Sequence, residues 1–183
     1  MVRPLLLLDV DGPLNPDAAK PHRRPPGYGT HRLMTPRWRA AERRRLAAWG
    51  LPHKEPKPLR VWLDPAHGRA LTALPFDLVW ATTWEEEANS FIGPVLGLPE
   101  LPVIAWSDPR PEPGGGVFWK TPEIVAWARG RPFAWVDDNI TAADRAFVRA
   151  HHDGPALLHH VDPKTGLTTD DFTRLADWAG TLD

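Results

Sequence analysis

Residues 5–12 read LLLLDVDG, four consecutive leucines followed by Asp9, Val10, Asp11 and Gly12. A short run that is apolar throughout, with no alternation, is typical of a strand buried on both faces of a parallel sheet. The two aspartates stand where that strand ends, and ligands bind at the carboxyl ends of strands in open α/β sheets. This stretch therefore predicts both a central strand and the beginning of a functional site.

Further apolar runs of strand length follow, each with turn signals close behind it. We expect strands at residues 5–10, 78–81, 133–136 and 156–161, and a fifth at 102–106. Helical patterns occupy residues 66–74, 84–92, 122–129, 141–150 and 170–178. This alternation predicts a doubly wound, Rossmann-like α/β fold, with a mostly parallel sheet and helices on both faces. We expect one such domain over residues 1–183.

Residues 13–59 interrupt the alternation as a long insertion rich in Pro, Gly and Arg. Thr35 followed by Pro36 predicts the start of a helix that ends at Trp49. Residues 59–63 then predict a short strand that returns towards the sheet. Insertions of this length in a compact domain are usually lids, binding elements or flexible segments, so we expect a flap or small cap.

The charge is unevenly distributed although the net charge is only −1. Residues 20–60 carry twelve Lys and Arg against two acidic residues, whereas the remainder carries ten basic and twenty-one acidic residues. A solvated basic helix and loop would explain this asymmetry, and so would an anionic partner such as nucleic acid. Arg43, Arg44 and Arg45 on the predicted helix are the candidates for holding a polyanionic substrate.

The composition excludes several classes of protein. The chain has no cysteine, which excludes a disulfide scaffold, a thiolate zinc site and a cysteine nucleophile and suits the cytoplasm. We find no apolar run of the roughly 20 residues needed to cross a bilayer, so we expect no membrane partner. The leucines of residues 5–8 are too few for the apolar core of a signal peptide.

Several polar side chains stand at the predicted strand ends or just before a helix on the same side of the sheet. They are Asp9, Asp11, Thr82, Thr83, Lys120, Asp137 and Asp138. Four carboxylates in one cleft repel one another and require a cation or a shared proton. Ligands that are all oxygen favour Mg²⁺. A lysine and a hydroxyl beside it suit the equatorial oxygens of a phosphoryl group, so the set predicts metal-assisted phosphoryl transfer.

In this order, the residues resemble the four motifs of the haloacid dehalogenase-like (HAD) hydrolases. Asp-x-Asp-Gly follows an apolar strand at residues 5–12, and a second strand ends in Thr82. Lys120 lies near a helix start, and paired aspartates at 137–138 follow a third strand. Residues 78–89 are also similar to a proposed RNA-repair-like phosphatase subgroup. The resemblance implies a HAD-like fold and a Mg²⁺-dependent phosphohydrolase.

The resemblance also implies catalytic roles. Asp9 would be the nucleophile that becomes an aspartyl-phosphate, and Asp11 would protonate the leaving group and later activate water. Lys120 would neutralise charge around Asp9. Thr82 would hydrogen-bond the transferring phosphoryl group, with Thr83 beside it as a substrate-binding residue.

The implied metal site and substrate follow from the same resemblance. Mg²⁺ would be held by the Asp9 side chain, the Asp11 backbone carbonyl and Asp137, with Asp138 either a further ligand or a neighbour of the ligands. Pro13 stands where many members carry Thr, so one hydroxyl near the site is missing. A small cap would leave the site open to large substrates, including polymer ends. We therefore expect a nucleic-acid end as a possible substrate beside a phosphorylated small molecule.

Three other functions use similar residues. A phospho-accepting receiver also combines aspartates, Thr, Lys and Mg²⁺, but there the acidic pair follows the first strand, whereas here it comes last. A nucleic-acid-binding module with relic catalytic residues would show steeply salt-dependent binding without turnover. A dehalogenase would have less need of Asp11 as a general acid. Hydrolysis and transfer to an alcohol both remain open, since they share one intermediate.

Overall fold

A four-stranded sheet in the order β4-β1-β5-β6 forms the centre of the protein, as described over residues 3–182 by a computed structural model. Its strands are β1 (Leu5–Leu8), β4 (Asp77–Trp80), β5 (Phe133–Asp137) and β6 (Ala156–His160). All three strand pairs are parallel. The four leucines of β1 are buried between two neighbouring strands and two layers of helices, which confirms the central strand predicted from their uninterrupted apolar run.

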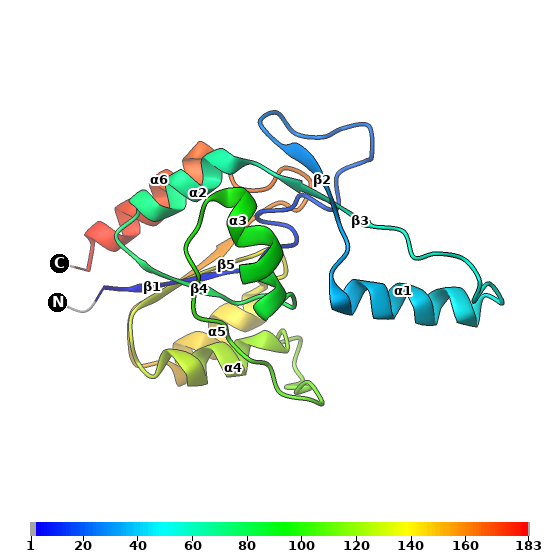
Figure 1. The fold of residues 1–183 in the computed structure, drawn as a ribbon. Helices are drawn as coiled ribbons and strands as arrows, with labels where there is room; N and C mark the ends of the chain where they lie inside the picture. Colours follow the sequence, from blue (N-terminus) through cyan, green and yellow to red (C-terminus); the bar gives the residue numbers. More distant parts are fainter. Residues whose placement is uncertain (1–2, 183) are drawn as a thin grey trace.

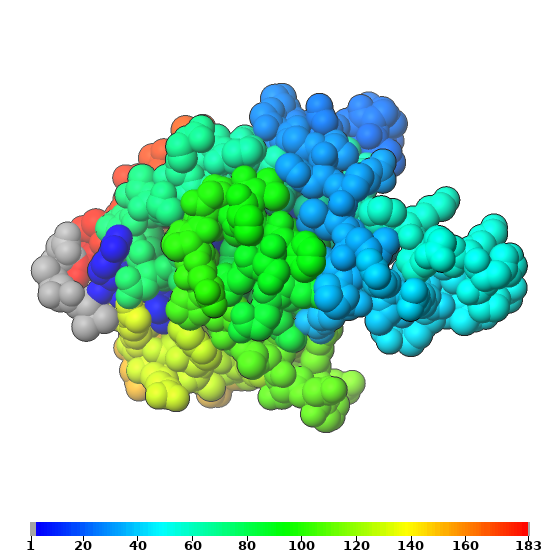
Figure 2. All heavy atoms as spheres, in the orientation of Figure 1, coloured from blue at the N-terminus to red at the C-terminus, as the bar shows by residue number. Residues whose placement is uncertain are grey.

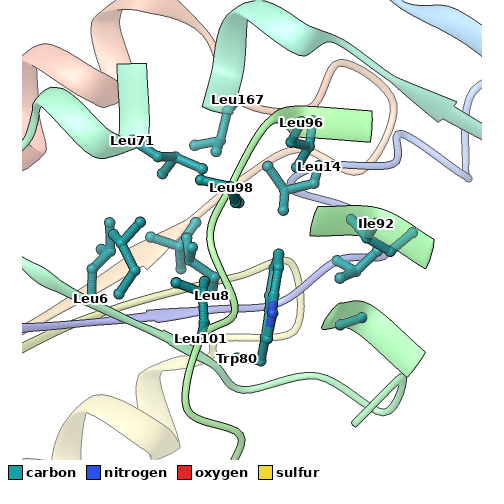
Figure 3. Packing of buried hydrophobic residues seen from close by; sticks show 14 of the residues in the cluster. Leu6, Leu8, Leu14, Leu71, Trp80, Ile92, Leu96, Leu98, Leu101 and Leu167 are labelled. Carbon is teal, nitrogen blue, oxygen red and sulfur yellow. The ribbon is translucent and has the colours of Figure 1, made fainter. Parts of the chain in front are cut away.

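Helices cover both faces of this sheet (Figure 1). They are α2 (Pro65–Ala73), α3 (Gly93–Leu96), α4 (Lys120–Ala128), α5 (Ala142–His151) and α6 (Thr169–Gly180). Leu6 and Leu8 point to the face covered by α2, α3 and α6, where Figure 3 shows them packed in one apolar cluster. Leu5 and Leu7 point the opposite way, since successive side chains in a strand alternate, and they pack with residues of α4 and α5. The doubly wound fold is therefore confirmed.

The helix expected at residues 84–92 differs in its bounds. The chain makes turns through residues 82–85, and helical structure then runs continuously from 86 to 96 through a π-helical segment, η1 (Ala88–Ile92), into α3. Within η1, Asn89 Oδ1 accepts hydrogen bonds from Trp80 Nε1 and from the Leu101 backbone N–H, both at 2.9 Å. This side chain therefore fixes the helical segment against the edge of the sheet.

The expected strand at residues 102–106 is absent from the described structure, so that prediction is wrong. Only Val103 forms a bridge, parallel to Trp80 of β4. Two hydrogen bonds hold it there, from Trp80 N to Pro102 O at 2.8 Å and from Ile104 N to Trp80 O at 2.9 Å. Pro102 has no N–H to extend the ladder on one side, and on the other side the Thr82 carbonyl accepts from the side chain of Trp106.

The insertion contains a second, two-stranded sheet. Residues 59–63 form a strand with the expected bounds, β3 (Leu59–Leu63), but it pairs antiparallel with β2 (Gly29–Leu33) and does not join the parallel sheet. The strand expected at 59–63 is therefore present, and it returns towards the main sheet by packing against it without pairing with it. We call β2 and β3 the ribbon. Val61 and Leu63 reach the main core from its inner face, so the ribbon attaches to the domain by packing.

Helix α1 (Pro36–Ala48) begins where the sequence predicts, because Thr35 Oγ1 accepts a hydrogen bond from Trp38 N at 3.1 Å. We call residues 34–58, which comprise α1 and the segment returning to β3, the arm. The arm extends away from the parallel sheet (Figure 1), and its atoms protrude from the body of the molecule (Figure 2). Only Glu42 and Leu46 of α1 are buried. Across the described residues, no helix combines the length and apolarity that a bilayer crossing requires.

Candidate active site

The register of the parallel sheet aligns the carboxyl ends of β4, β1 and β5. Leu8 of β1 pairs with Trp80 of β4 and with Val136 of β5. The ladder continues one step further, with Asp9 N donating to Val136 O at 3.0 Å and Ala81 N donating to Leu8 O at 2.8 Å. The residues that follow, Asp9, Thr82 and Asp137, therefore leave the sheet at a common edge.

Lys120, the first residue of α4, reaches into this edge. Its Nζ lies 2.7 Å from Asp9 Oδ2 and 2.8 Å from Asp137 Oδ2, and the residue is only 1% exposed. Burial alone would lower the pKa of Lys120, but the charges and hydrogen bonds of the two carboxylates outweigh it and raise that pKa above its usual value. The ammonium group is therefore held charged between the two acids.

The start of α4 is fixed by a residue that the sequence analysis did not select. Asp144 Oδ1 accepts from Phe118 N at 2.7 Å and from Thr121 Oγ1 at 2.6 Å, on either side of Lys120. Its other oxygen accepts from the backbone and side chain of Thr141, which closes a capping box at the start of α5. Although burial favours its neutral form, these donors hold the pKa of Asp144 below its ordinary value. The spacing Thr141-x-x-Asp144 was the available sequence signal.

Three carboxylates converge beside Lys120. One oxygen each of Asp9, Asp137 and Asp138 lies within 4.8 Å of the others. Burial, with the neighbouring charge of Asp9, raises the pKa of both Asp137 and Asp138. A single ammonium group leaves this set with excess negative charge, and a ligand set made only of oxygens fits a hard divalent cation such as Mg²⁺. Asp138 therefore lies close enough to Asp9 and Asp137 to be a ligand of the same metal ion.

Gly12 allows Asp138 to approach this closely. Its φ is +89°, and a Cβ atom there would lie 2.6 Å from Asp138 Cγ. Both the backbone conformation and the space therefore require glycine at the fourth position of Asp-x-Asp-Gly.

Both carboxylate oxygens of Asp11 are held by side chains that the sequence analysis missed. Asn15 Nδ2 donates to Oδ1 at 2.8 Å, and Trp84 Nε1 donates to Oδ2 at 2.9 Å. Burial, reinforced by the charge of Asp9, raises the pKa of Asp11 to about 6 in spite of these donors. Asn15 Oδ1 also accepts from Trp62 N of β3 at 2.9 Å, so the ribbon is tied to Asp11 through one side chain.

The two threonines after β4 lie in different surroundings. Thr82 is fully buried, and its backbone carbonyl accepts from Trp106 Nε1 at 2.9 Å. Thr83 is half-buried and lines a cleft at the edge of the site. Its carbonyl accepts from Arg37 Nη1 of α1 at 3.1 Å, and Arg37 also pairs with Glu85 at 3.0 Å. The first turn of the arm is therefore attached to the loop that carries both threonines.

The cleft opens above Asp11 and has a volume of about 680 Å³. Its lining combines Asp11, Asp17 and Glu87 with four arginines, Arg37, Arg44, Arg60 and Arg110, and with the aromatic residues Trp38 and Trp84. These residues come from the loop after β1, the arm, β3 and the loops after β4. The insertion therefore forms one wall of the cleft.

The three arginines selected from the sequence do not act together. Arg44 lines the cleft, whereas Arg43 lines a separate hollow beside Arg39. Arg45 is paired with Glu42 and lies over the rings of Trp38 and Trp49. Consecutive side chains on a helix point about 100° apart, which separates the three. The sequence analysis missed Arg37, Arg60 and Arg110, because no local pattern connects them.

The comparison with families of known proteins gives a match over residues 5–172, to the model described as the HAD domain in Swiss Army Knife RNA repair proteins. The matched range includes every strand-end residue of the site from Asp9 to Asp138. The curated proteins and the solved structures give no significant match.

Proposed function

Because the chain belongs to the family of HAD domains found in Swiss Army Knife RNA repair proteins, we propose that it is a Mg²⁺-dependent phosphohydrolase that acts on a phosphomonoester. One observation carries this proposal. The ammonium group of Lys120 and the carboxylates of Asp9, Asp137 and Asp138 meet where β1 and β5 end. A buried cation beside a carboxylate and a candidate metal site is an arrangement suited to phosphoryl transfer.

Asp9 would be the nucleophile. Val10 N donates to Asp9 Oδ1 at 2.8 Å and Lys120 donates to Oδ2, so the carboxylate is fixed in orientation. Attack on phosphorus would form the bond between an Asp9 oxygen and phosphorus, while the bond from phosphorus to the ester oxygen breaks. Water would then cleave the aspartyl-phosphate and release inorganic phosphate.

Asp11 would move the protons. A carboxyl group with a pKa of about 6 carries a proton in part of the molecules near neutral pH, so it can protonate the leaving oxygen and then accept a proton from the attacking water. Asn15 and Trp84 hold it at the floor of the cleft through which substrate enters. Their hydrogen bonds orient the group before substrate arrives.

The remaining residues would bind the metal ion and the phosphoryl group. The side chains of Asp9, Asp137 and Asp138, with the Asp11 backbone carbonyl, would hold Mg²⁺, which supplies positive charge to the phosphoryl oxygens when bound. Thr82 would hydrogen-bond those oxygens, and Lys120 would neutralise charge around Asp9. The arginine-lined cleft and the family support a nucleic-acid end as substrate over a small metabolite.

Hydrolysis of an aryl phosphate tests this proposal, measured with Mg²⁺, with chelator and with the Asp9→Asn variant. We expect turnover that disappears both with chelator and with the variant, because Asn is nearly isosteric but cannot form the acyl phosphate. Turnover by Asp9→Asn at the wild-type rate would refute the assigned nucleophile. Circular dichroism spectra of the variant and wild type show whether the variant keeps its structure.

A second candidate is a nucleic-acid-binding module without turnover. Four arginines around the cleft favour it, because they could bind phosphates without the chemistry at Asp9. Steeply salt-dependent RNA binding, with no turnover of any phosphorylated RNA end by a protein that binds Mg²⁺, would select this function.

A further inference from the structure

The ribbon presents two different faces. Its register places Thr30 opposite Trp62 and Arg32 opposite Arg60, so these four side chains share one face. The other face carries Val61, which is fully buried in the main core. The face with the arginines is therefore the outer face, directed away from the parallel sheet.

A hollow of about 590 Å³ lies over this outer face. Arg24, Arg32 and Arg60 line it together with His22, Thr30 and Trp62. No carboxylate lines it in the part of the chain that the structure describes. The hollow is therefore a positively charged surface, whereas the catalytic cleft mixes both signs of charge.

Two of the arginines are held in place by the ribbon. Trp62 Nε1 donates to Thr30 Oγ1 at 3.0 Å, and Arg24 Nη1 donates to the same oxygen at 2.9 Å. The guanidinium of Arg60 lies over the ring of Trp62, 4.1 Å from its centroid. Side chains fixed in this way lose less conformational freedom when they bind an anion.

These arginines also lack acidic partners. Arg37, Arg45 and Arg131 each pair with a carboxylate, but within residues 3–182 no salt bridge involves those of the hollow. Arg32 and Arg60 even stand directly opposite each other, an arrangement in which like charges repel. An anionic ligand bound across the ribbon would relieve this repulsion.

The hollow lies next to the catalytic cleft, because Arg60 lines both. We propose that the outer face of the ribbon binds the phosphate backbone of a single-stranded nucleic acid whose phosphorylated end occupies the cleft. This inference rests on the proposed function and deepens it. It assigns Arg24, Arg32 and Arg60 to the nucleotides behind the reacting end, and it explains why the insertion is attached to Asp11 through Asn15.

The chemistry of the surface favours this partner. Guanidinium groups match the oxygens of phosphodiesters in a forked geometry. Asp9 is only 6% exposed and Asp11 lines the cleft, so a strand end must enter past Asp11 to react. An unpaired end does so without melting a duplex.

The double variant Arg24→Ala/Arg32→Ala tests the surface, because neither residue lines the catalytic cleft. Its matched control, Arg149→Ala/Arg174→Ala, removes two exposed charges on α5 and α6. The probe is a fluorescent, end-phosphorylated RNA decamer, and its Kd is measured by anisotropy at several salt concentrations. We expect the double variant to bind at least tenfold more weakly and to lose about 1.4 from the slope of log K against log salt, about 0.7 per phosphate contact. The control should stay within twofold of wild type.

Two further measurements separate this surface from the proposed function. Aryl phosphate turnover should be equal in the double variant and wild type, because the substrate is too small to reach the ribbon. Normal turnover with unchanged RNA binding in the double variant would overturn the surface and leave the phosphohydrolase standing. Absent turnover with RNA binding that still depends on Arg24 and Arg32 would overturn the phosphohydrolase alone. Equal competition by polyglutamate of the same charge would overturn the assignment to nucleic acid.

Discussion

Lys120 balances the charge of two buried carboxylates, so a variant that lacks it should depend more strongly on Mg²⁺ for its stability. Lys120→Met would leave Asp9 and Asp137 facing each other without their ammonium partner, a change that costs about 3–5 kcal/mol when a buried pair is broken. We expect a lowered melting temperature that Mg²⁺ raises more strongly in the variant than in wild type. Thermal melts with Mg²⁺ and with chelator measure this, and an equal Mg²⁺ effect on both proteins would contradict it.

We expect Trp84 to affect catalysis through its hydrogen bond to Asp11. Trp84→Phe removes the indole N–H that holds Asp11 Oδ2 and leaves a similar ring in the core. Protonation of the leaving group matters more for an alkyl ester than for an aryl ester with a stable leaving group. We expect kcat for an alkyl phosphate to fall about tenfold and kcat for an aryl phosphate to change less than twofold.

The control for this prediction is Trp127→Phe, at a half-buried tryptophan of α4 that makes no side-chain hydrogen bond within the described residues. It should leave both rates unchanged. Equal losses on the two esters in Trp84→Phe would show that the ring only supports the fold.

At the scale of residues, the sequence predicted the parts of the site that follow strands. Asp9, Thr82 and Asp137 were found because each comes after an apolar run, and their roles remain predictions. Asn15 and Trp84 were missed because their contacts with Asp11 depend on how two loops meet in space. No periodicity encodes such a meeting, since Trp84 and Asp11 are 73 positions apart in the chain.

Among the elements, the start of α4 depends on the cap of α5. Asp144 has its pKa held below the ordinary value of 3.8, so its contribution to stability is present above that value and is lost as the pH falls through the lower, folded value. Asp144→Asn should therefore lower the free energy of unfolding by about 1–3 kcal/mol at pH 7, with a difference from wild type that shrinks below about pH 4.

Denaturant unfolding at several pH values measures this difference. Asp170→Asn is the control, because Asp170 is an exposed first-turn acid of α6 that holds no neighbouring helix. A constant gap between Asp144→Asn and wild type from pH 7 to pH 3 would contradict the prediction.

The elements of the fold were predicted to different degrees for physical reasons. Strands β1 and β5 are buried throughout and β4 and β6 in part, so their apolar runs identified them. Strand β2 alternates between half-buried and exposed residues, and its sequence Gly-Thr-His-Arg-Leu carries too little apolar character to predict a strand. In the segment 102–106, Ile104 is buried in the core, but only Val103 pairs with β4, and Pro102 has no N–H to extend the ladder on one side.

At the scale of the whole molecule, we expect the protein to fold without the arm. Leu33 and Leu59 are paired at the end of the ribbon, so a two-residue Asn-Gly turn could replace residues 34–58 and close a hairpin. This replacement removes the hydrogen bond from Arg37 to the Thr83 carbonyl and the exposed ion pair between Arg37 and Glu85, and such ion pairs contribute at most about 1 kcal/mol to stability. We expect a folded protein whose melting temperature falls only by a few degrees.

The shortened protein should hydrolyse an aryl phosphate within tenfold of the wild-type kcat, while KM for a phosphorylated oligonucleotide rises because Trp38 and Arg44 are gone from the cleft. Steady-state kinetics on both substrates measure this. Loss of aryl phosphate turnover in a folded variant would show that the arm contributes to the chemistry.

The central position of β1 has a consequence for synthesis on the ribosome. Residues 5–8 pair with residues 77–80 on one side and 133–136 on the other, so the central strand has no completed neighbour when it emerges. At about 5–20 residues per second, its four leucines wait roughly 6–26 s for β5. During this interval the nascent chain exposes its most apolar strand, which makes it a natural client for a chaperone that binds short apolar segments.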